Sequence, residues 1–209
     1  MYSHRDIYAA IIYGFIPFNS NSNYHNKIMK YQIIYADPPW DFGGCKLNVS
    51  TGGKEISDHY PTMSDKDIIK LPIKELSDTN CLLFLWVVYS KLPLAFKCID
   101  SWGFKYSTVA FEWLKRTSTG KPVCFMGRWV CGGAIELCLL ARKGSVPRIS
   151  KCVHRLIDSP REQHSKKPSE TRDRIVSLVG DISRVELFAR QKTEGWDIWG
   201  NEVESDIEL

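Results

Sequence analysis

The chain has 209 residues, which is a typical length for one domain and short for two. Hydrophobic residues make up 44% and charged residues 25%, an ordinary globular composition that argues against a disordered, collagen-like or coiled-coil protein. The formal net charge is only +4, which argues against a protein that coats nucleic acid through bulk charge, so any polyanion site is local. Seven Trp residues favour a site for a flat ligand, because a Trp ring has to pack or stack.

The cysteine pattern and the lengths of the apolar stretches predict the cellular compartment and whether the chain enters a membrane. The seven cysteines are odd in number and show no C-x-x-C spacing, which argues against a disulfide framework and a structural zinc site. We therefore expect a reducing compartment and no metal. The apolar stretch at residues 7–18 is too short to span a bilayer, and no small-residue cleavage pattern follows it. The sequence thus predicts a soluble, cytoplasmic protein without a membrane segment.

Strand-like and helix-like segments alternate after a polar stretch at residues 19–26. Residues 81–88 are almost continuously apolar, which is typical of a strand covered on both faces. The expected strands are residues 31–36, 81–88, 104–114, 135–141 and 184–189, and the expected helices are a short one from Ser64 and longer ones at residues 92–102 and 168–179. This alternation predicts an α/β fold, an open and mostly parallel sheet with helices on both faces. We expect one domain over residues 1–209, with residues 1–30 as an N-terminal extension to which no role is assigned.

The first expected strand ends at Ala36 and runs into Asp37-Pro38-Pro39-Trp40. Ligands of open parallel sheets bind at the carboxyl ends of strands, so this tetrapeptide lies where a ligand is expected. Asp37 offers carboxylate oxygens, the two prolines fix the direction of the Pro38 carbonyl, and Trp40 offers a face for stacking. Together they suit a planar group with an amino substituent, such as adenine, whose nitrogen becomes positively charged during attack. The alternative is a surface turn in which Asp37 caps a helix.

The tetrapeptide and six other elements resemble the MT-A70 family of S-adenosylmethionine-dependent adenine-N6 methyltransferases. In this sequence the elements are residues 35–40 (YADPPW), 59–65 (HYPTMSD), 83–87 (LFLWV), 102–104 (WGF), 164–168 (HSKKP), 186–190 (ELFAR) and 195–202 (GWDIWGNE). They keep the family's order from about residue 31 to residue 202. The resemblance implies a Rossmann-like methyltransferase fold with permuted motif order, in which the catalytic strand comes first and the cofactor strand last. It also implies S-adenosylmethionine as cofactor and the adenine N6 amino group as methyl acceptor.

The residues expected to bind S-adenosylmethionine lie at the end of the first strand, at the start of the helix that follows residue 166, and at and beyond the end of the last strand. A helix that opens at Lys167 has free N–H groups that attract a carboxylate. We assign Lys167 to the methionine carboxylate, as the resemblance also implies, the alternative being a solvated helix start. Phe188 and Arg190 should flank the ribose and the methionyl part, and two later residues suit the ribose hydroxyls or the adenine edge. The full expected set is Ala36, Asp37, Lys167, Phe188, Arg190, Asn201 and Glu202. Neither G-x-G-x-x-G nor G-x-x-x-x-G-K-[ST] occurs, which disfavours NAD and ATP hydrolysis.

Three residues are expected to contact the target base. Tyr60 matches an aromatic residue that the family places over the base, whereas its neighbour His59 is interpreted as structural. Ser165, in the HSKKP element, is assigned to the substrate as well. Glu136 stands at the start of an apolar run, and either faces the base or simply terminates its strand.

Residues 142–167 form a basic segment with eight Lys or Arg and two acids. Residues 142–165 lack periodicity, so we expect a long loop that ends at the cofactor helix and contacts phosphates. Arg148, Lys151 and Arg155 are the residues that we expect to make these phosphate contacts. The alternative is an ordinary solvated loop. A second basic set, in the other long loop, is Lys115, Arg116, Lys121 and Arg128.

The function predicted from the sequence is methyl transfer from S-adenosylmethionine to adenine N6 in DNA. RNA is the alternative substrate, because the family includes both, and the small size of the chain tilts the choice to DNA. A non-catalytic subunit that presents nucleic acid would lack the acceptor tetrapeptide, which is intact here. Methylation of a protein glutamine would use Asn rather than Asp37 in the first position. The expected partner is nucleic acid, and both a homodimer and a separate partner subunit stay open.

Overall fold

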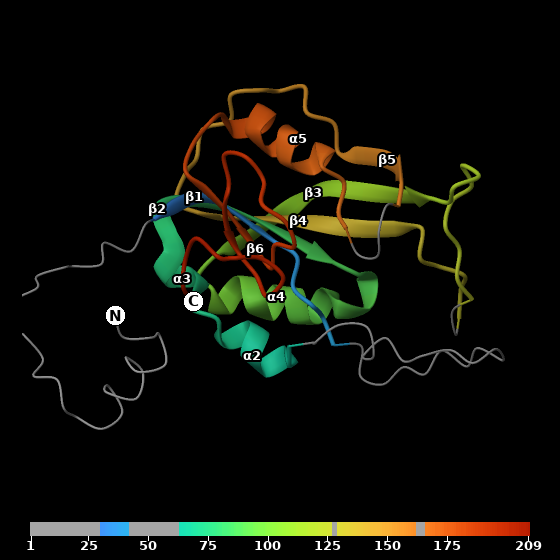
Figure 1. Cartoon of the computed structure of the whole chain (residues 1–209), viewed down its shortest axis with the longest axis horizontal. Helices are drawn as coiled ribbons and strands as arrows, with labels where there is room; N and C mark the ends of the chain where they lie inside the picture. The colour runs from blue at the N-terminus through green and yellow to red at the C-terminus, as the bar shows by residue number, and fades with distance from the viewer. Residues whose placement is uncertain (1–29, 42–62, 127–128, 162–165) are drawn as a thin grey trace, which may run out of the picture.

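The computed structural model of the chain describes residues 30–41, 63–126, 129–161 and 166–209. Its centre is a seven-stranded sheet in the order β5-β3-β4-β2-β1-β6-β7 (Figure 1). The strands are β1 (Tyr31–Ala36), β2 (Ser77–Val87), β3 (Lys105–Arg116), β4 (Ile135–Lys143), β5 (Leu156–Pro160), β6 (Arg184–Leu187) and β7 (Asp197–Trp199).

The sheet is mixed, because β4 runs antiparallel to both of its neighbours, β2 and β3. The other four neighbouring pairs are parallel. Six strands therefore end at one edge of the sheet, which we call the carboxyl edge, and β4 begins there. This arrangement brings the residues that follow β1 and β6 together with the first residues of β4.

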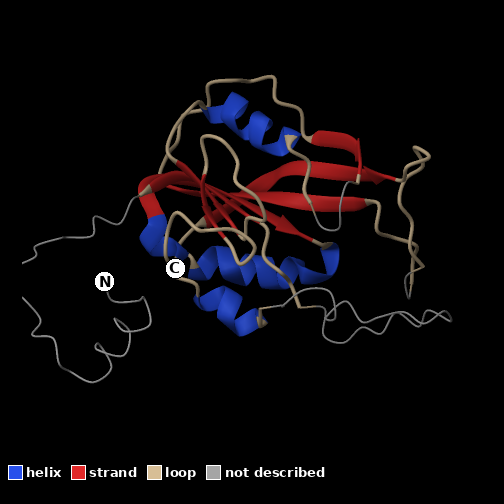
Figure 2. Cartoon of the chain, in the orientation of Figure 1, coloured by secondary structure: helices blue, strands red, loops and turns tan. Residues whose placement is uncertain are grey.

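Helices cover both faces of the sheet, as the alternating pattern predicts (Figures 1 and 2). On one face lie α2 (Asp65–Lys70), α3 (Ile73–Leu76) and α4 (Leu92–Ser101), and on the other lies α5 (Glu170–Val179). A short 3-10 turn, η2 (Tyr89–Lys91), leads into α4. The prediction of an α/β fold is confirmed.

The two faces of β2 show how the sheet is buried. Leu83 and Leu85 belong to the core cluster that includes Ile99 of α4. Phe84 belongs to the second cluster, which includes Ile175 of α5. Since successive side chains of a strand point to opposite faces, an apolar run is what a strand between two helix layers requires.

Local signals in the sequence set several element boundaries. Ser64 is the N-cap of α2, where its Oγ accepts a hydrogen bond from the backbone N–H of Asp67. Asp67 in turn accepts one from the Ser64 hydroxyl, at 2.6 Å. Gly103 and Gly180 follow the two longer helices with φ of 80° and 93°, which glycine adopts without strain.

The prediction of a loop over residues 142–165 is wrong in part. β4 extends to Lys143, and β5 forms within the segment. β5 is an edge strand in which Ile157 alone is buried, so the sequence shows no apolar run there. β7, another edge strand of three residues, and the single turn of α3 were likewise not predicted.

Within the described residues, no helix has the length and apolar character needed to cross a membrane. The same part of the chain shows no cluster of His, Cys, Asp or Glu side chains suited to a metal ion. Its cysteines are free thiols, buried at positions 81, 98 and 138 and exposed at positions 124, 131 and 152.

Candidate active site

Asp37 follows the last residue of β1 at the centre of the carboxyl edge. Ala36 pairs with Leu85 of β2 and with Leu187 of β6, so β1 lies between two parallel strands. The backbone N–H of Asp37 donates to the Leu187 carbonyl at 3.5 Å, which extends the pairing by one residue. The side chain of Asp37 is 25% exposed, so its carboxylate borders on solvent while its backbone is held by the sheet.

A chain of alternating charges starts at this carboxylate. The Lys167 Nζ atom donates to Oδ2 of Asp37 at 2.6 Å and lies 3.3 Å from Oε2 of Glu136. On the far side of Glu136, the Lys115 Nζ atom donates to Oε1 at 2.7 Å. The ammonium group of Lys167 also lies 5.6 Å from the centre of the Trp86 ring, a cation–π distance. The ends of β1, β3 and β4 and the segment before α5 therefore meet in one electrostatic cluster.

Burial and pairing shift the proton affinities in this cluster. Burial raises the pKa of the Asp37 carboxyl above its ordinary value, and the charge of Lys167 only partly offsets this effect. Burial also acts to raise the pKa of Glu136, but Lys167 and Lys115 outweigh it and hold that pKa below its ordinary value. Burial acts to lower the pKa of Lys167, and its two carboxylate partners reverse this, so the pKa is raised. Lys167 is therefore a cation and Glu136 an anion at neutral pH.

The structure places Trp40 differently from the expected stacking plate. Its ring is buried in the core, 5% exposed, and its Nε1 donates to the Trp86 carbonyl at 3.0 Å. Its backbone N–H donates to the Pro38 carbonyl at 2.8 Å, which closes a tight turn through Pro39. Trp40 thus anchors the turn that presents Asp37 and fixes the Pro38 carbonyl. Direct stacking of Trp40 on a base stays a prediction that this placement does not support.

The residues expected at the cofactor lie together after β6 and β7. Phe188 has a φ of 63°, a left-handed conformation that is costly for a bulky residue and that occurs preferentially at functional sites. Its ring meets that of Trp199 edge-on, with the ring centres 5.3 Å apart. The Arg190 Nε atom lies 3.7 Å from Oε1 of Glu202. The backbone of Gly200 runs so close to Ala189 that a side chain there would overlap the Ala189 carbonyl.

These residues have the chemistry that S-adenosylmethionine requires. The charge of Arg190 is near enough to Asp37 to lower the pKa of that carboxyl, so the strand ends of β1 and β6 share one site. Lys167 and Arg190 offer cations for a carboxylate, and Asp37 and Glu202 offer acceptors for an amine and for hydroxyls. Asn201 is exposed beside Glu202. The residues present fit the cofactor.

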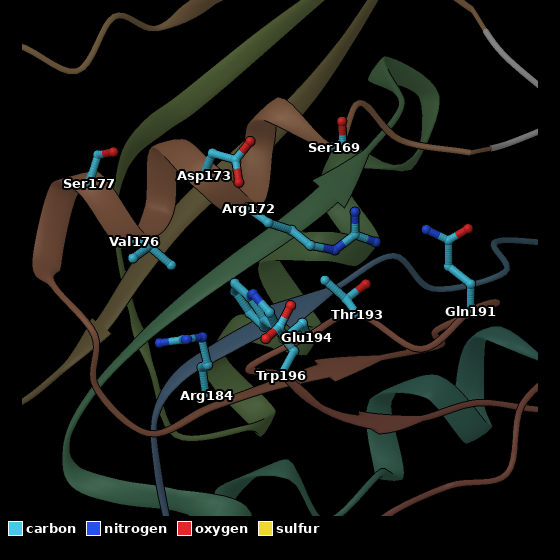
Figure 3. A pocket seen from close by; sticks show the side chains of 10 residues that line it. All are labelled: Ser169, Arg172, Asp173, Val176, Ser177, Arg184, Gln191, Thr193, Glu194 and Trp196. Atoms are coloured by element: carbon cyan, nitrogen blue, oxygen red, sulfur yellow. The ribbon is translucent and has the colours of Figure 1, made fainter.

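A separate pocket of about 420 Å³ lies between α5 and the segment that joins β6 to β7 (Figure 3). Its lining residues are Ser169, Arg172, Asp173, Val176, Ser177, Arg184, Gln191, Thr193, Glu194 and Trp196. Arg172 is engaged in a buried bidentate pair with Glu186, at 2.6 and 2.7 Å, and its guanidinium lies over the Tyr35 ring. None of the residues predicted for cofactor or substrate lines this pocket, and we assign no ligand to it.

The three basic residues expected to contact phosphates, Arg148, Lys151 and Arg155, do not lie together with Asp37. The backbone N–H groups of residues 149 and 150 donate to the Leu178 carbonyl, at the end of α5. Arg148 and Lys151 therefore flank the C-terminal end of α5, whereas Lys167 precedes its N-terminus, about 15 Å away along a ten-residue helix. Arg155 lies beside the middle of β3, where its Nη2 donates to the Thr108 hydroxyl at 3.4 Å. The structure thus places these three residues away from Asp37, and their contact with phosphates stays a prediction.

Two substrate assignments lie outside the described residues, namely Tyr60 and Ser165, together with His59. Glu136 lies in the charge cluster, which favours the alternative in which it faces the site. Lys115 was predicted only as a phosphate contact, although it belongs to the same cluster. Its position at the end of a strand that stops at the carboxyl edge is the signal that could have placed it.

Comparison with known proteins decides the family. A family model described as MT-A70 matches residues 31–202, most of the chain. The chain belongs to the MT-A70 family. The predicted membership is therefore confirmed, and with it S-adenosylmethionine as methyl donor and the methyltransferase class of activity.

Three relatives illustrate the range of this MT-A70 family. The Type II methyltransferase M.MunI of Mycoplasma sp is 35% identical over 196 residues, 86% of this chain and 81% of the relative. The human N(6)-adenine-specific methyltransferase METTL4 is 30% identical over 190 residues, 83% of this chain and 37% of the relative. An N(6)-adenosine-methyltransferase MT-A70-like protein of Arabidopsis thaliana is 27% identical over 182 residues, which are 83% of this chain and 24% of the relative. The chain thus spans most of the first relative and between about a quarter and two fifths of the other two.

Proposed function

We propose that this protein transfers the methyl group of S-adenosylmethionine to the N6 amino group of adenine in DNA. The observation that carries the proposal is the carboxylate of Asp37 at the carboxyl edge, on a turn anchored by Trp40 and beside the charge cluster of Lys167 and Glu136. One relative, of which the chain covers 81%, is a Type II methyltransferase, and a second is named for specificity to N(6)-adenine. The first name agrees with methyl transfer, and the second agrees with adenine N6 as the acceptor.

Asp37 and the Pro38 carbonyl have the roles of acceptors for the two amino hydrogens of adenine. The amino nitrogen of adenine is a weak nucleophile, because its lone pair is delocalised into the ring. Two acceptors favour a more pyramidal nitrogen and stabilise the positive charge that grows as its bond to the methyl carbon forms. Bound S-adenosylmethionine supplies that methyl on a sulfonium, whose carbon–sulfur bond breaks to leave a neutral thioether. The N6 proton is lost after the new bond has formed, when the nitrogen is acidic, so no base is needed before attack.

In this scheme Lys167 binds two carboxylates in turn, that of Asp37 and that of the cofactor. Its ammonium group lies on Asp37, whereas the sequence assigns it to the methionine carboxylate of the cofactor. A turn of the Lys167 side chain toward that carboxylate would release the Asp37 oxygen for the amine. Cofactor binding would then prepare the acceptor for the base.

The remaining site residues enter this proposal in their predicted roles. Phe188, Arg190, Asn201 and Glu202 would hold the cofactor from the strand end of β6 and from the segment after β7. Tyr60 would lie over the target base, and Glu136 would face it. In duplex DNA the adenine first has to leave the base stack. β1 would carry the catalytic turn and β6 the cofactor turn, which is the permuted order predicted from the sequence.

RNA is the second candidate substrate, because one relative is named an N(6)-adenosine-methyltransferase. The test is incubation with tritiated S-adenosylmethionine and with DNA and RNA oligonucleotides of the same sequences, followed by digestion and nucleoside analysis. We expect label in N6-methyldeoxyadenosine. Label in N6-methyladenosine alone would assign the protein to RNA, and no label in either would contradict the proposed activity.

A further inference from the structure

Between β3 and β4 the structure describes residues 117–126 and 129–134, which form the two arms of a ribbon beyond the ends of both strands (Figure 1). Phe125 and Gly132 exchange two backbone hydrogen bonds, of 2.7 and 3.0 Å, and Arg116 pairs with Pro122 nearer the sheet. The Phe125 ring packs on the backbone of Gly133, where any side chain would overlap it. Backbone hydrogen bonds therefore hold the two described arms of the ribbon together.

The end of this ribbon carries exposed apolar side chains. Met126 is 90% exposed, Trp129 is 87% exposed and Val130 is 76% exposed. Among the large hydrophobic side chains that the structure describes, these three are the most exposed. We call them the apolar tip. Clustered exposed apolar side chains of this size mark a binding surface.

The ribbon starts at the candidate active site. Lys115, at its root, pairs with Glu136, and its backbone bonds to Val123 and Ala134 hold the two arms of the ribbon to the sheet. With about 3.3 Å per residue along a strand, the apolar tip lies roughly 10–15 Å from that root. A macromolecule that presents a group to Asp37 is therefore within reach of the apolar tip.

The charge of the ribbon favours a polyanion as its occupant. Residues 115–133 contain four Lys or Arg and no acid. Lys115 and Arg116 pair with Glu136 and Asp158 of the sheet, whereas Lys121 is exposed in the turn that joins Arg116 to Pro122 at the root of the ribbon. Like charges oppose the docking of an identical ribbon from a second copy of the chain. A duplex with its phosphates and its apolar base stack matches both properties of the ribbon.

We propose that the apolar tip inserts between base pairs of duplex DNA and fills the space that the target adenine vacates when it turns toward Asp37. This inference rests on the proposed function. Trp129 and Met126 would replace the stacking that the neighbouring bases lose, which lowers the cost of extruding the adenine. The tip is thus a positioning element that acts through the conformation of the DNA.

The test compares the double variant M126A/W129A with the wild type and with Tyr106→Ala. Tyr106 is an aromatic residue that is 40% exposed and lies about 30 Å from Lys115, at the other end of β3, so it controls for loss of an exposed ring. The sequence that wild-type protein methylates is first mapped in mixed-sequence duplex DNA. Two duplexes with this sequence are then made, one fully paired and one with an abasic site opposite the target adenine. Calorimetric titration with S-adenosylmethionine checks that each variant keeps its cofactor site.

We expect M126A/W129A to lower kcat/KM on the paired duplex about tenfold to a hundredfold, the size of a lost stacking contact. On the duplex with the abasic site, where the adenine is already unpaired, the expected loss is below about threefold. Tyr106→Ala should match the wild type on both. Unchanged activity on the paired duplex would overturn the inference, and so would equal losses on both duplexes. A wild-type dimer that the double variant converts to monomer would also overturn it, because the tip would then bind a second copy. Failure of the wild type to methylate any DNA would overturn the proposed function itself.

Discussion

Lys167 lies with its Nζ atom 2.6 Å from Oδ2 of Asp37, although 130 positions separate the two residues in the chain. The same ammonium group is 3.3 Å from Glu136, so it neutralises two carboxylates that would otherwise repel each other at the carboxyl edge. The acceptor for the adenine amine and the cation assigned to the cofactor are therefore coupled. Several predictions about one residue thus bear on the other.

Lys167→Ala should weaken the binding of S-adenosylmethionine about tenfold, as expected for one lost charge-assisted contact. Isothermal titration calorimetry measures this directly. Lys166→Ala removes the same charge one position earlier and should leave the dissociation constant within about twofold of the wild type. An unchanged constant in Lys167→Ala would contradict the assignment of this lysine to the methionine carboxylate.

The pH dependence of methyl transfer should also report on this pair. Burial raises the pKa of Asp37 and the charge of Lys167 lowers it, so Lys167→Met should raise that pKa further. Because the reaction needs the ionised carboxylate, the rate falls as pH falls through this pKa. The acidic limb of the kcat/KM profile should therefore move to higher pH in the variant.

Lys115→Met is the matched control for the pH profile. Lys115 lowers the pKa of Glu136. It is not among the groups that shift the pKa of Asp37. Its removal should leave the acidic limb closer to that of the wild type. An acidic limb that does not move in Lys167→Met would show that Asp37 is not the group whose ionisation controls the rate.

Glu186→Gln should destabilise the fold, because it leaves the buried guanidinium of Arg172 without its carboxylate. The loss of one partner of a buried ion pair costs about 3–5 kcal/mol, to be measured as the free energy of unfolding in urea. Glu170→Gln, which breaks a more exposed pair with Arg174 on α5, should cost less than about 1 kcal/mol. Equal effects of the two substitutions would contradict the structural role given to the buried pair.

The salt dependence of DNA binding should separate the two basic sets. Lys121→Ser, in the ribbon, should lower the slope of log affinity against log salt by about 0.9 if it contacts a phosphate of duplex DNA. The triple change of Arg148, Lys151 and Arg155 to Ser should lower the slope less, since two of these residues flank the far end of α5. A larger loss of slope in the triple variant would place the DNA backbone over that end of α5 instead.

The sequence predicted the centre of the sheet and the position of the acceptor turn for physical reasons that act locally. An apolar run that ends at Asp37-Pro38-Pro39 has to leave the sheet there, because two prolines cannot continue a strand. The edge strands β5 and β7 escaped prediction, since each buries little and shows no apolar pattern.

The contacts of the site depend on tertiary structure and were less accessible. No spacing along the chain indicates that Lys115, Glu136 and Lys167 bond in series. The register between β3 and β4 brings Lys115 to Glu136, and the segment before α5 brings Lys167 to the same carboxylate. The burial of Trp40 depends on the Trp86 carbonyl, which accepts its N–H from the neighbouring strand. A motif thus located the site, whereas packing determined which side chains face the substrate.

The central claim is that the carboxylate of Asp37 supports methyl transfer to adenine N6. The most direct measurement is the single-turnover rate of tritium transfer from S-adenosylmethionine to duplex DNA, with N6-methyldeoxyadenosine identified after digestion, for the wild type and for Asp37→Ala. We expect the rate to fall on the order of a hundredfold or more, because the lost contact is made mainly in the transition state, while cofactor affinity stays within a few-fold. A rate in Asp37→Ala above about a tenth of the wild-type rate would contradict the account.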